Sequence, residues 1–241
     1  MSDVMTPVQF KELLYWILKE FRNENTIFGI HKDKFYRKPD NSYFKIFGEK
    51  CETPLGPAAG PHTQQTPNIV ASYLTGSRFF ELKTVQILDN LEVEKPCIEA
   101  VDEGYNTEWS TELTVQQAYE EYVKGWFLLH VLSKMLKLSR GEDRAFVFNM
   151  SVGYDLKGIK DPKIDNFIEH MKDASNNPVF LECQKILKEA ITAGDIPNLK
   201  DPAFVENISP HISNSITLST MHGCPPQDQE LICKYLIGEK K

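Results

Sequence analysis

Four short apolar runs recur along the chain, and stretches with helical spacing separate them. The runs are TPLGPAA at 53–59, RFFELKTV at 78–85, AFVFNMSV at 145–152 and SITLSTM at 215–221. Strands of a parallel sheet that is covered on both faces show continuous apolar runs of this kind instead of strict alternation. The pattern therefore predicts four parallel strands that are joined by helical connections, as in βαβ units.

The connecting stretches carry helix signals. Apolar residues recur at helical spacing from Phe10 to Phe21, after the segment 6–9 (TPVQ), which has the residue types of a capping box. A longer helix is predicted at 115–138, behind a second capping box at 114–117. Further helices are predicted at 68–74, 163–174, 179–193 and 227–237.

Four βα units amount to half of a (β/α)8 barrel, or to an open sheet. We predict the α/β class and, within it, a partial (β/α)8 TIM barrel in a single domain. The segment 1–52 is expected to form an N-terminal helix and a barrel-bottom extension, with a turn or short hairpin around 39–42. The segment 53–241 is expected to form the four βα units, with a helical insertion before the fourth strand.

Composition narrows the class of protein. The chain has 241 residues, of which 41% are hydrophobic and 25% charged, which is ordinary for a globular protein. Its net charge of -7 argues against nucleic-acid binding, because such proteins need a basic surface to displace phosphate counterions. No apolar run has the length of a membrane span and the start lacks a signal peptide, so we expect a cytoplasmic protein without a membrane partner.

Cysteine usage points away from disulfides and metals. The five cysteines are odd in number, widely spaced and without a C-x-x-C pair, so they encode neither a disulfide framework nor a zinc or iron–sulfur site. Four are expected to be structural thiols, and Cys224 is the exception because of the loop that holds it. The cysteines are Cys51, Cys97, Cys183, Cys224 and Cys233.

In a (β/α)8 barrel, reactive residues lie at the carboxyl ends of the strands. Lys83 ends the second run, where an unpaired buried ammonium would be costly, so it is expected to meet an anion or a carbonyl. The alternative is a lysine that emerges into solvent. Cys224 follows the fourth run beside His222, where a thiol can give or take a proton, and an inert loop cysteine is the simpler alternative.

Two further segments allow both a functional and a structural interpretation. The segment 56–60 (GPAAG) has small side chains, so a flat ring would fit close to its backbone, but a tight turn needs the same residues. Asn106 lies in a polar stretch, where its amide would bind a planar heterocycle through a paired donor and acceptor. A turn-forming asparagine is the alternative.

These segments resemble a known family. TPLGPAAGPHTQ, RFFELKTVQ, YNTEWSTEL, FNMSVGYDLKGIK and ITLSTMHGCPP occur in the order and approximate spacing of the flavin-binding barrels of dihydroorotate and dihydropyrimidine dehydrogenases. Over essentially its whole length, the chain is also similar to the N-terminal part of the selenate reductase iron–sulfur subunit family. The resemblance implies an oxidoreductase with FMN in this barrel, and with 4Fe–4S clusters and FAD or NAD(P) only in downstream modules.

The resemblance also implies which residues hold the cofactor. In the dehydrogenases the small-residue turn after the first strand packs on FMN, and it corresponds here to Ala58, Ala59 and Gly60. The positions of Lys83 and Thr84 contact the flavin in those enzymes, and the lysine also reaches the substrate. Lys83 is thus expected to be both a cofactor-binding and a catalytic residue.

The substrate is implied to lie beside the flavin. Asn106 and His222 are expected to bind it, and Cys224 is expected to exchange a proton with it as hydride moves to or from flavin N5. The chain departs from the dehydrogenases at Met221, where they have an asparagine three residues before the cysteine. A thioether cannot replace the paired hydrogen bonds of an amide, which argues against a standard pyrimidine substrate.

Flavin phosphate in such barrels is held by the loops after strands seven and eight, which four units do not supply. FMN binding is therefore expected to be weak or absent in this chain, which is expected to be inactive without the remainder of the barrel or redox partner subunits. The alternative from another class is a non-catalytic interaction or scaffold module, or a truncated gene product. The open edges of a half-barrel would then invite a partner or self-association.

Overall fold

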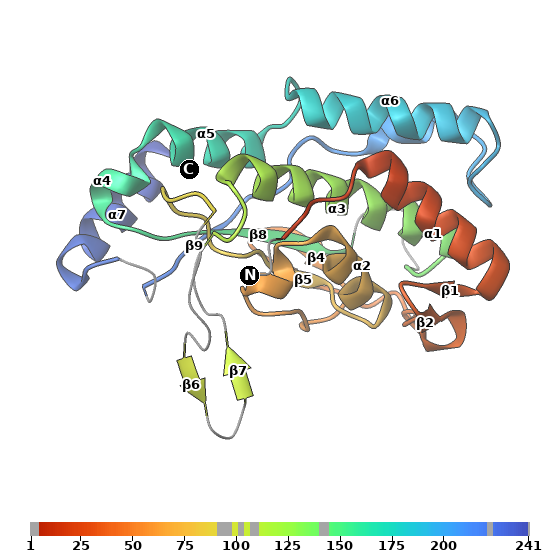
Figure 1. The fold of residues 1–241 in the computed structure, drawn as a ribbon, viewed down its shortest axis with the longest axis horizontal. Coiled ribbons are helices and arrows are strands. Elements are labelled where there is room, and N and C mark those ends of the chain that lie inside the picture. The colour runs from red at the N-terminus through yellow and green to blue at the C-terminus, as the bar shows by residue number, and fades with distance from the viewer. Residues whose placement is uncertain are drawn as a thin grey trace.

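The computed structural model describes residues 5–90, 98–100, 104–106, 111–139, 145–220 and 224–240. An N-terminal helix and two small hairpins precede a part in which helices and strands alternate (Figure 1). The helices are α1 Phe10–Glu24, α2 Thr66–Leu74, α3 Val115–Leu136, α4 Leu156–Ile159, α5 Pro162–Lys172, α6 Pro178–Thr192 and α7 Pro226–Glu239, with 3-10 turns η1 Lys32–Lys34, η2 Pro61–Thr63 and η3 Pro202–Asn207. The strands are β1 Thr26–Ile27, β2 Ile30–His31, β3 Phe44–Ile46, β4 Glu49–Cys51, β5 Phe79–Glu81, β6 Ile98–Ala100, β7 Gly104–Asn106, β8 Val147–Val152 and β9 Ile216–Leu218.

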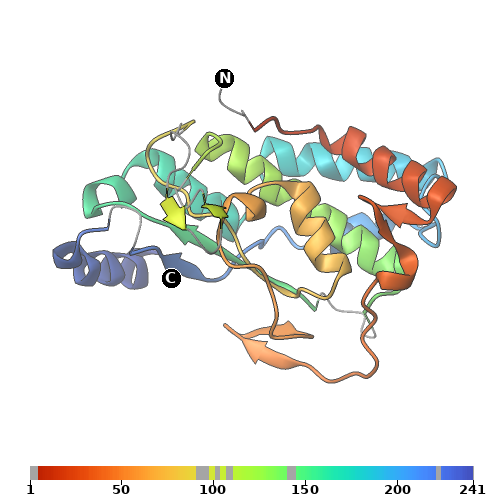
Figure 2. The same cartoon turned by 60° about the horizontal axis from the view of Figure 1, so that its bottom comes forward.

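A three-stranded parallel sheet forms the centre of the fold. Its order is β5-β8-β9, with Phe80 paired to Phe148 and Met150 paired to Ile216. Helices α1, α3, α5 and α6 contact one another and lie on one side of this sheet, while the β3–β4 hairpin lies on the side away from them (Figure 2). The predicted α/β class with parallel strands is therefore confirmed.

Aromatic side chains fill the space between the sheet and α3. The ring centroids of Phe80 and Phe148 are 5.4 Å apart, and the ring of Trp126 on α3 lies 5.4 Å from that of Phe148, edge to face. All three residues are fully buried. Buried residues occupy nearly every side of α3, which is typical of a core helix, and the sheet is packed on it.

Local signals predicted some boundaries and missed others. The capping box before α3 is confirmed, because Thr114 Oγ1 accepts a hydrogen bond from Gln117 N and Gln117 Oε1 accepts one from Thr114 N, each at 3.1 Å. The box predicted before α1 is wrong, because α1 begins at Phe10 and its N-cap residue Gln9 makes no side-chain cap bond. The turn predicted around 39–42 is present between the hairpins, where Asp40 accepts from the Ser42 N–H.

The strand predicted at 53–59 is wrong. The segment lies alongside β5, where Leu55 O accepts from Phe79 N at 3.1 Å and Pro57 O accepts from Glu81 N at 3.4 Å. Its two prolines have no N–H to return such bonds, so the segment stays an irregular edge. The described part of the chain thus holds three parallel strands where four were predicted.

Arg78 fixes the start of β5. Its side chain is fully buried, Nε donates to Glu52 Oε2 at 3.1 Å and Nη1 donates to Tyr73 O at 2.8 Å. The guanidinium also lies 4.1 Å from the centroid of the Tyr73 ring, a cation–π contact. The second oxygen of Glu52 accepts from Ser139 Oγ at 2.6 Å. Because removing either charge would leave the other buried and unpaired, this pair holds β5 in one position.

Gly56→Ala is expected to destabilise the protein, because a Cβ at this position would lie 1.3 Å from the carbonyl oxygen of Phe79. The edge segment would have to move off β5, so we expect a loss of about 1–3 kcal/mol in the free energy of unfolding, measured by urea denaturation. Gly238→Ala in α7 is the matched control, because no atom lies within 4 Å of its Cβ position. Equal effects of the two substitutions would contradict the close approach of the edge segment.

Candidate functional site

One face of the parallel sheet is polar. Glu81 of β5 is paired with Asn149 of β8, and the Asn149 side chain links two residues at β9. Asn149 Oδ1 accepts from Ser215 Oγ, and Asn149 Nδ2 donates to Thr217 Oγ1, each at 2.6 Å. Because side chains alternate across a strand, these residues share one face, and the aromatic residues that pack on α3 share the other.

A bulge follows at the carboxyl end of β5. The register shifts by one residue between the pair at Glu81 and the bridge at Val85, so three residues of this segment lie opposite two of β8. Bulges are frequent next to active sites, because the extra residue redirects side chains. This bulge contains Lys83 and Thr84, and it brings Thr84 Oγ1 to 2.9 Å from Ser151 Oγ.

Lys83 is buried at this bulge, with 2% of its surface exposed. Tyr122 of α3 donates its hydroxyl to Lys83 O at 2.9 Å, which fixes the backbone there. Of the two sequence interpretations, the lysine that emerges into solvent is therefore wrong. Burying an ammonium is costly unless charge or hydrogen bonds compensate for it, and Lys83 is not without a partner.

The small-residue turn lies against the same strand. Ala59 N donates to Glu81 Oε2 at 3.1 Å, which ties the turn to the polar face of the sheet. Gly60 starts a tight turn into η2, because its carbonyl accepts from Thr63 N at 2.9 Å. Ala58 is exposed, so the turn presents a methyl group and open backbone. Both sequence interpretations of this segment are thus compatible with its geometry.

Cys224 lies on the loop between β9 and α7. It is buried, with 4% of its surface exposed, and burial raises the pKa of its thiol, with Asp228 and Cys233 adding to the shift. The loop after β8 is attached to the same place, because Leu156 N donates to Asp228 Oδ2 at 3.2 Å. A thiol with a raised pKa is protonated near neutral pH, so the thiolate is the minor form there.

Parallel pairing determines which predicted residues come together. The carboxyl ends of β5, β8 and β9 lie at one edge of the sheet, so the bulge with Lys83 and Thr84, the end of β8 with Ser151, and the loop with Cys224 all start there. We call this edge, together with the polar face below it, the mouth.

Two predicted substrate residues are not placed at the mouth. Asn106 ends β7, which pairs with β6 in a separate two-stranded antiparallel sheet. His222 lies outside the described residues, as does Met221. The substrate roles of Asn106 and His222 stay predictions.

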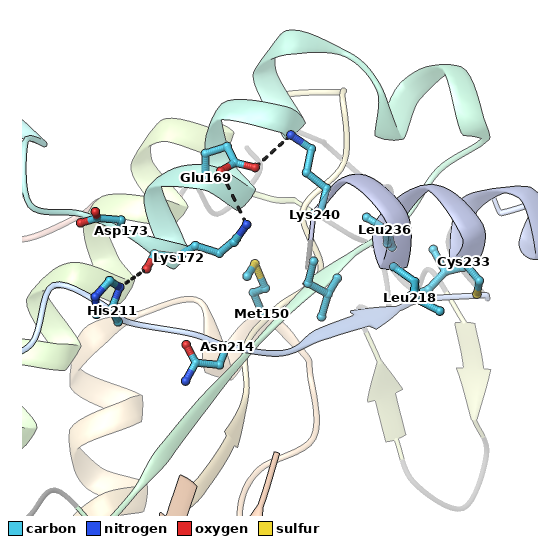
Figure 3. A pocket seen from close by; sticks show the side chains of 12 residues that line it. Met150, Glu169, Lys172, Asp173, His211, Asn214, Leu218, Cys233, Leu236 and Lys240 are labelled. Carbon is cyan, nitrogen blue, oxygen red and sulfur yellow. Dashed lines mark hydrogen bonds and ion pairs between the residues drawn. The ribbon is translucent and has the colours of Figure 1, made fainter. Parts of the chain in front are cut away.

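A cavity of about 810 Å³ lies on the other face of the sheet, between β9, α5 and α7 (Figure 3). Its apolar wall includes Met150, Leu218 and Leu236, and its rim carries His211, whose Nδ1 lies 2.6 Å from Lys172 O. The lining residues of β8 and β9 point away from the polar side chains described above. This cavity is therefore distinct from the mouth.

The predicted site does not include the residues that make the sheet polar on one side: Glu81, Asn149, Ser215 and Thr217. The polar members of the predicted strands occur at every second position. That period-two spacing was the available signal for a polar face. Within the described ranges, no cluster of three or more His, Cys, Asp or Glu residues has the arrangement of a metal site.

Parallel strands that alternate with helices, with polar side chains at their carboxyl ends, are features of α/β proteins, a class that includes the TIM barrels. The family model described as "Oxidoreductase YgfK, N-terminal TIM-barrel domain" matches residues 28–241. The chain belongs to this family of oxidoreductase TIM-barrel domains.

Two curated relatives, from Escherichia coli strain K12 and Escherichia coli O157:H7, carry the name "Putative oxidoreductase YgfK". Each is 47% identical to this chain over 256 residues, a match that covers 100% of this chain and 24% of the relative. The chain thus spans about a quarter of the length of these relatives. No solved structure gives a significant match. No helix in the described part of the chain is long and apolar enough to cross a membrane.

Cys224 is expected to react slowly with iodoacetamide at neutral pH and faster as the pH rises, because burial raises its pKa and the thiolate is the reactive form. The exposed Cys233 is expected to be alkylated first. Peptide mass spectrometry over a time course measures both rates, and a Cys233→Ser variant removes the fast site as a control. Alkylation of Cys224 as fast as Cys233 at neutral pH would show a thiolate and exclude its role as a proton donor.

Proposed function

We propose that this chain forms part of the active-site wall of a flavin-dependent oxidoreductase, and that its mouth holds FMN beside a small planar or oxyanionic substrate. The observation that carries the proposal is the burial of Lys83 in a bulge at the carboxyl end of β5. Reactive residues of a barrel lie at the carboxyl ends of its strands, and Lys83 brings a positive charge to this edge, which suits an anionic or strongly polarised ligand.

The residues present fit the ring system of a flavin. Lys83 supplies positive charge, and the exposed Ala58 and the turn around it leave room for a flat ring beside the backbone. The hydroxyl groups of Thr84 and Ser151 lie next to Lys83 in the chain or across the bulge and supply polar contacts. When bound, FMN would supply the hydride or electron transfer that these side chains cannot perform.

The protein groups would then divide the remaining tasks. Lys83 would neutralise negative charge on the flavin or on the substrate. Cys224, held protonated by burial, would donate a proton to the substrate and recover one from solvent. The turn at Ala59, tied to Glu81, would keep the wall of the site at a fixed distance from β5.

In the whole protein, further segments would supply the parts of the barrel that this chain does not contain. Its curated relatives are about four times as long as the matched part, and a closed barrel has eight parallel strands. We propose that the remainder of the barrel supplies the phosphate site, and that iron–sulfur clusters in further modules exchange electrons with FMN. Selenate reduction is one activity of this type.

The surface also supports the role of an interaction module. Strand β9 ends the parallel sheet and its three residues are only partly buried. Helix α7 buries Ile232 alone, while Leu231 and Ile237 are 49% and 63% exposed. An unpaired strand edge beside exposed apolar residues invites a partner, and the remainder of the barrel is the partner that we propose.

The proposal is tested by mixing this chain with the part of the Escherichia coli relative that lies beyond the matched quarter. After gel filtration with FMN, the complex is expected to retain flavin absorbance, and this chain alone little or none. Lys83→Ala in the complex is expected to weaken FMN binding roughly 10-fold or more, because it removes a hydrogen bond to a charged group. The exposed Lys185→Ala on α6 is the control and is expected to bind as the wild type does.

Two results would contradict the proposal. A complex that forms but binds no flavin would exclude FMN as the cofactor. Stoichiometric FMN with turnover in this chain alone would exclude the need for the remainder of the barrel.

A further inference from the structure

We infer that Tyr154 is a ligand-positioning residue of the mouth, and that it contacts the flavin, a planar heterocycle with ring carbonyl groups. Tyr154 follows β8 by two residues and has no role in the sequence reading. The inference rests on the proposed function, because it takes the mouth to be the ligand site.

The backbone of Tyr154 is strained. Its φ angle is 140°, whereas the other non-glycine residues with positive φ lie between 45° and 63°, in the ordinary left-handed helical region. A φ near 140° is a region that glycine adopts readily and that a residue with a side chain avoids. Residues in such conformations persist only where their surroundings hold them, and they cluster at functional sites.

The segments on both sides of Tyr154 are held firmly. Before it, Gly153 N donates to Val85 O at 3.0 Å, which ties the chain to the bulge at the end of β5. After it, Asp155 Oδ1 accepts from Gly158 N at 2.7 Å and caps α4. Leu156 N then donates to an α7 carboxylate, which joins the segment to the helix that follows Cys224. The residues on both sides of Tyr154 are therefore tied to the bulge at the end of β5 and to α7.

The side chain of Tyr154 packs against α4. A Cβ on Gly158 would lie 2.4 Å from Tyr154 Cδ1, so the ring rests against the backbone of α4 where only glycine leaves room. The ring is only partly buried, and its hydroxyl forms no hydrogen bond with any of the described residues. Glycine at position 154 would adopt this φ angle with less conformational strain. The ring packs on α4, and the hydroxyl is left for a contact outside the described fold.

The position of Tyr154 suits a ligand contact. β8 is the middle strand of the sheet, so the loop that it starts lies between the bulge with Lys83 and the loop with Cys224. A phenol there offers a flat apolar face and a hydroxyl donor. Those are the groups that hold a planar ring with carbonyl oxygens.

Three variants of this chain test the inference: Tyr154→Gly, Tyr154→Phe and, as a control, Tyr43→Phe on the exposed part of the β3–β4 hairpin. The melting temperature of each is measured, and FMN binding is measured by fluorescence titration after each is combined with the part of the Escherichia coli relative that lies beyond the matched quarter. We expect Tyr154→Gly to melt at a higher temperature than the wild type, because glycine relieves the strain. Tyr154→Phe is expected to melt as the wild type does but to bind FMN roughly 3- to 10-fold more weakly, the value of one hydrogen bond.

The two measurements separate this inference from the proposed function. A melting temperature of Tyr154→Phe well below that of the wild type would show that the hydroxyl serves the fold, and would overturn the inference. Unchanged FMN affinity in Tyr154→Phe, with binding by the wild type, would overturn the inference and leave the proposed function standing. If the wild-type complex binds no FMN, the proposed function fails as well.

Discussion

Parallel pairing of β5, β8 and β9 is the constraint on which the rest of the structure depends. Strands that run in the same direction place all their carboxyl ends at one edge, so residues far apart in the sequence start their loops side by side. The buried pair of Arg78 and Glu52 fixes the opposite end of β5. With that end fixed, the one-residue bulge after Glu81 determines where Lys83 and Thr84 lie.

Because side chains alternate across a strand, the two faces of the sheet carry different kinds of residue. One face of the sheet carries the aromatic residues that pack on α3 and stabilise the domain. The other carries Glu81, Asn149 and Thr217, which bond to one another or to the small-residue turn. The cavity between α5 and α7 belongs to the first face, so its size alone does not make it the site of the reaction. A member of an oxidoreductase barrel family is expected to use the second face, at the mouth.

The sequence predicted the elements whose signals are local. The capping box and long apolar pattern of α3, and the continuous apolar run of β8, were read correctly because each depends on near neighbours. The segment 53–59 was misread because prolines prevent a ladder without making a segment less apolar. The bulge that contains Lys83 and the strained backbone of Tyr154 were not predictable, since both depend on contacts between segments that are distant in sequence.

The most direct test of the account is an NMR titration of this chain with FMN, which detects even weak binding through shifts of backbone amide signals. The account predicts that the signals that move are those of the mouth: Ala59, Thr84, Tyr154 and Cys224. Shifts confined to the cavity on the opposite face, for example at Asn214 and Leu236, would contradict it.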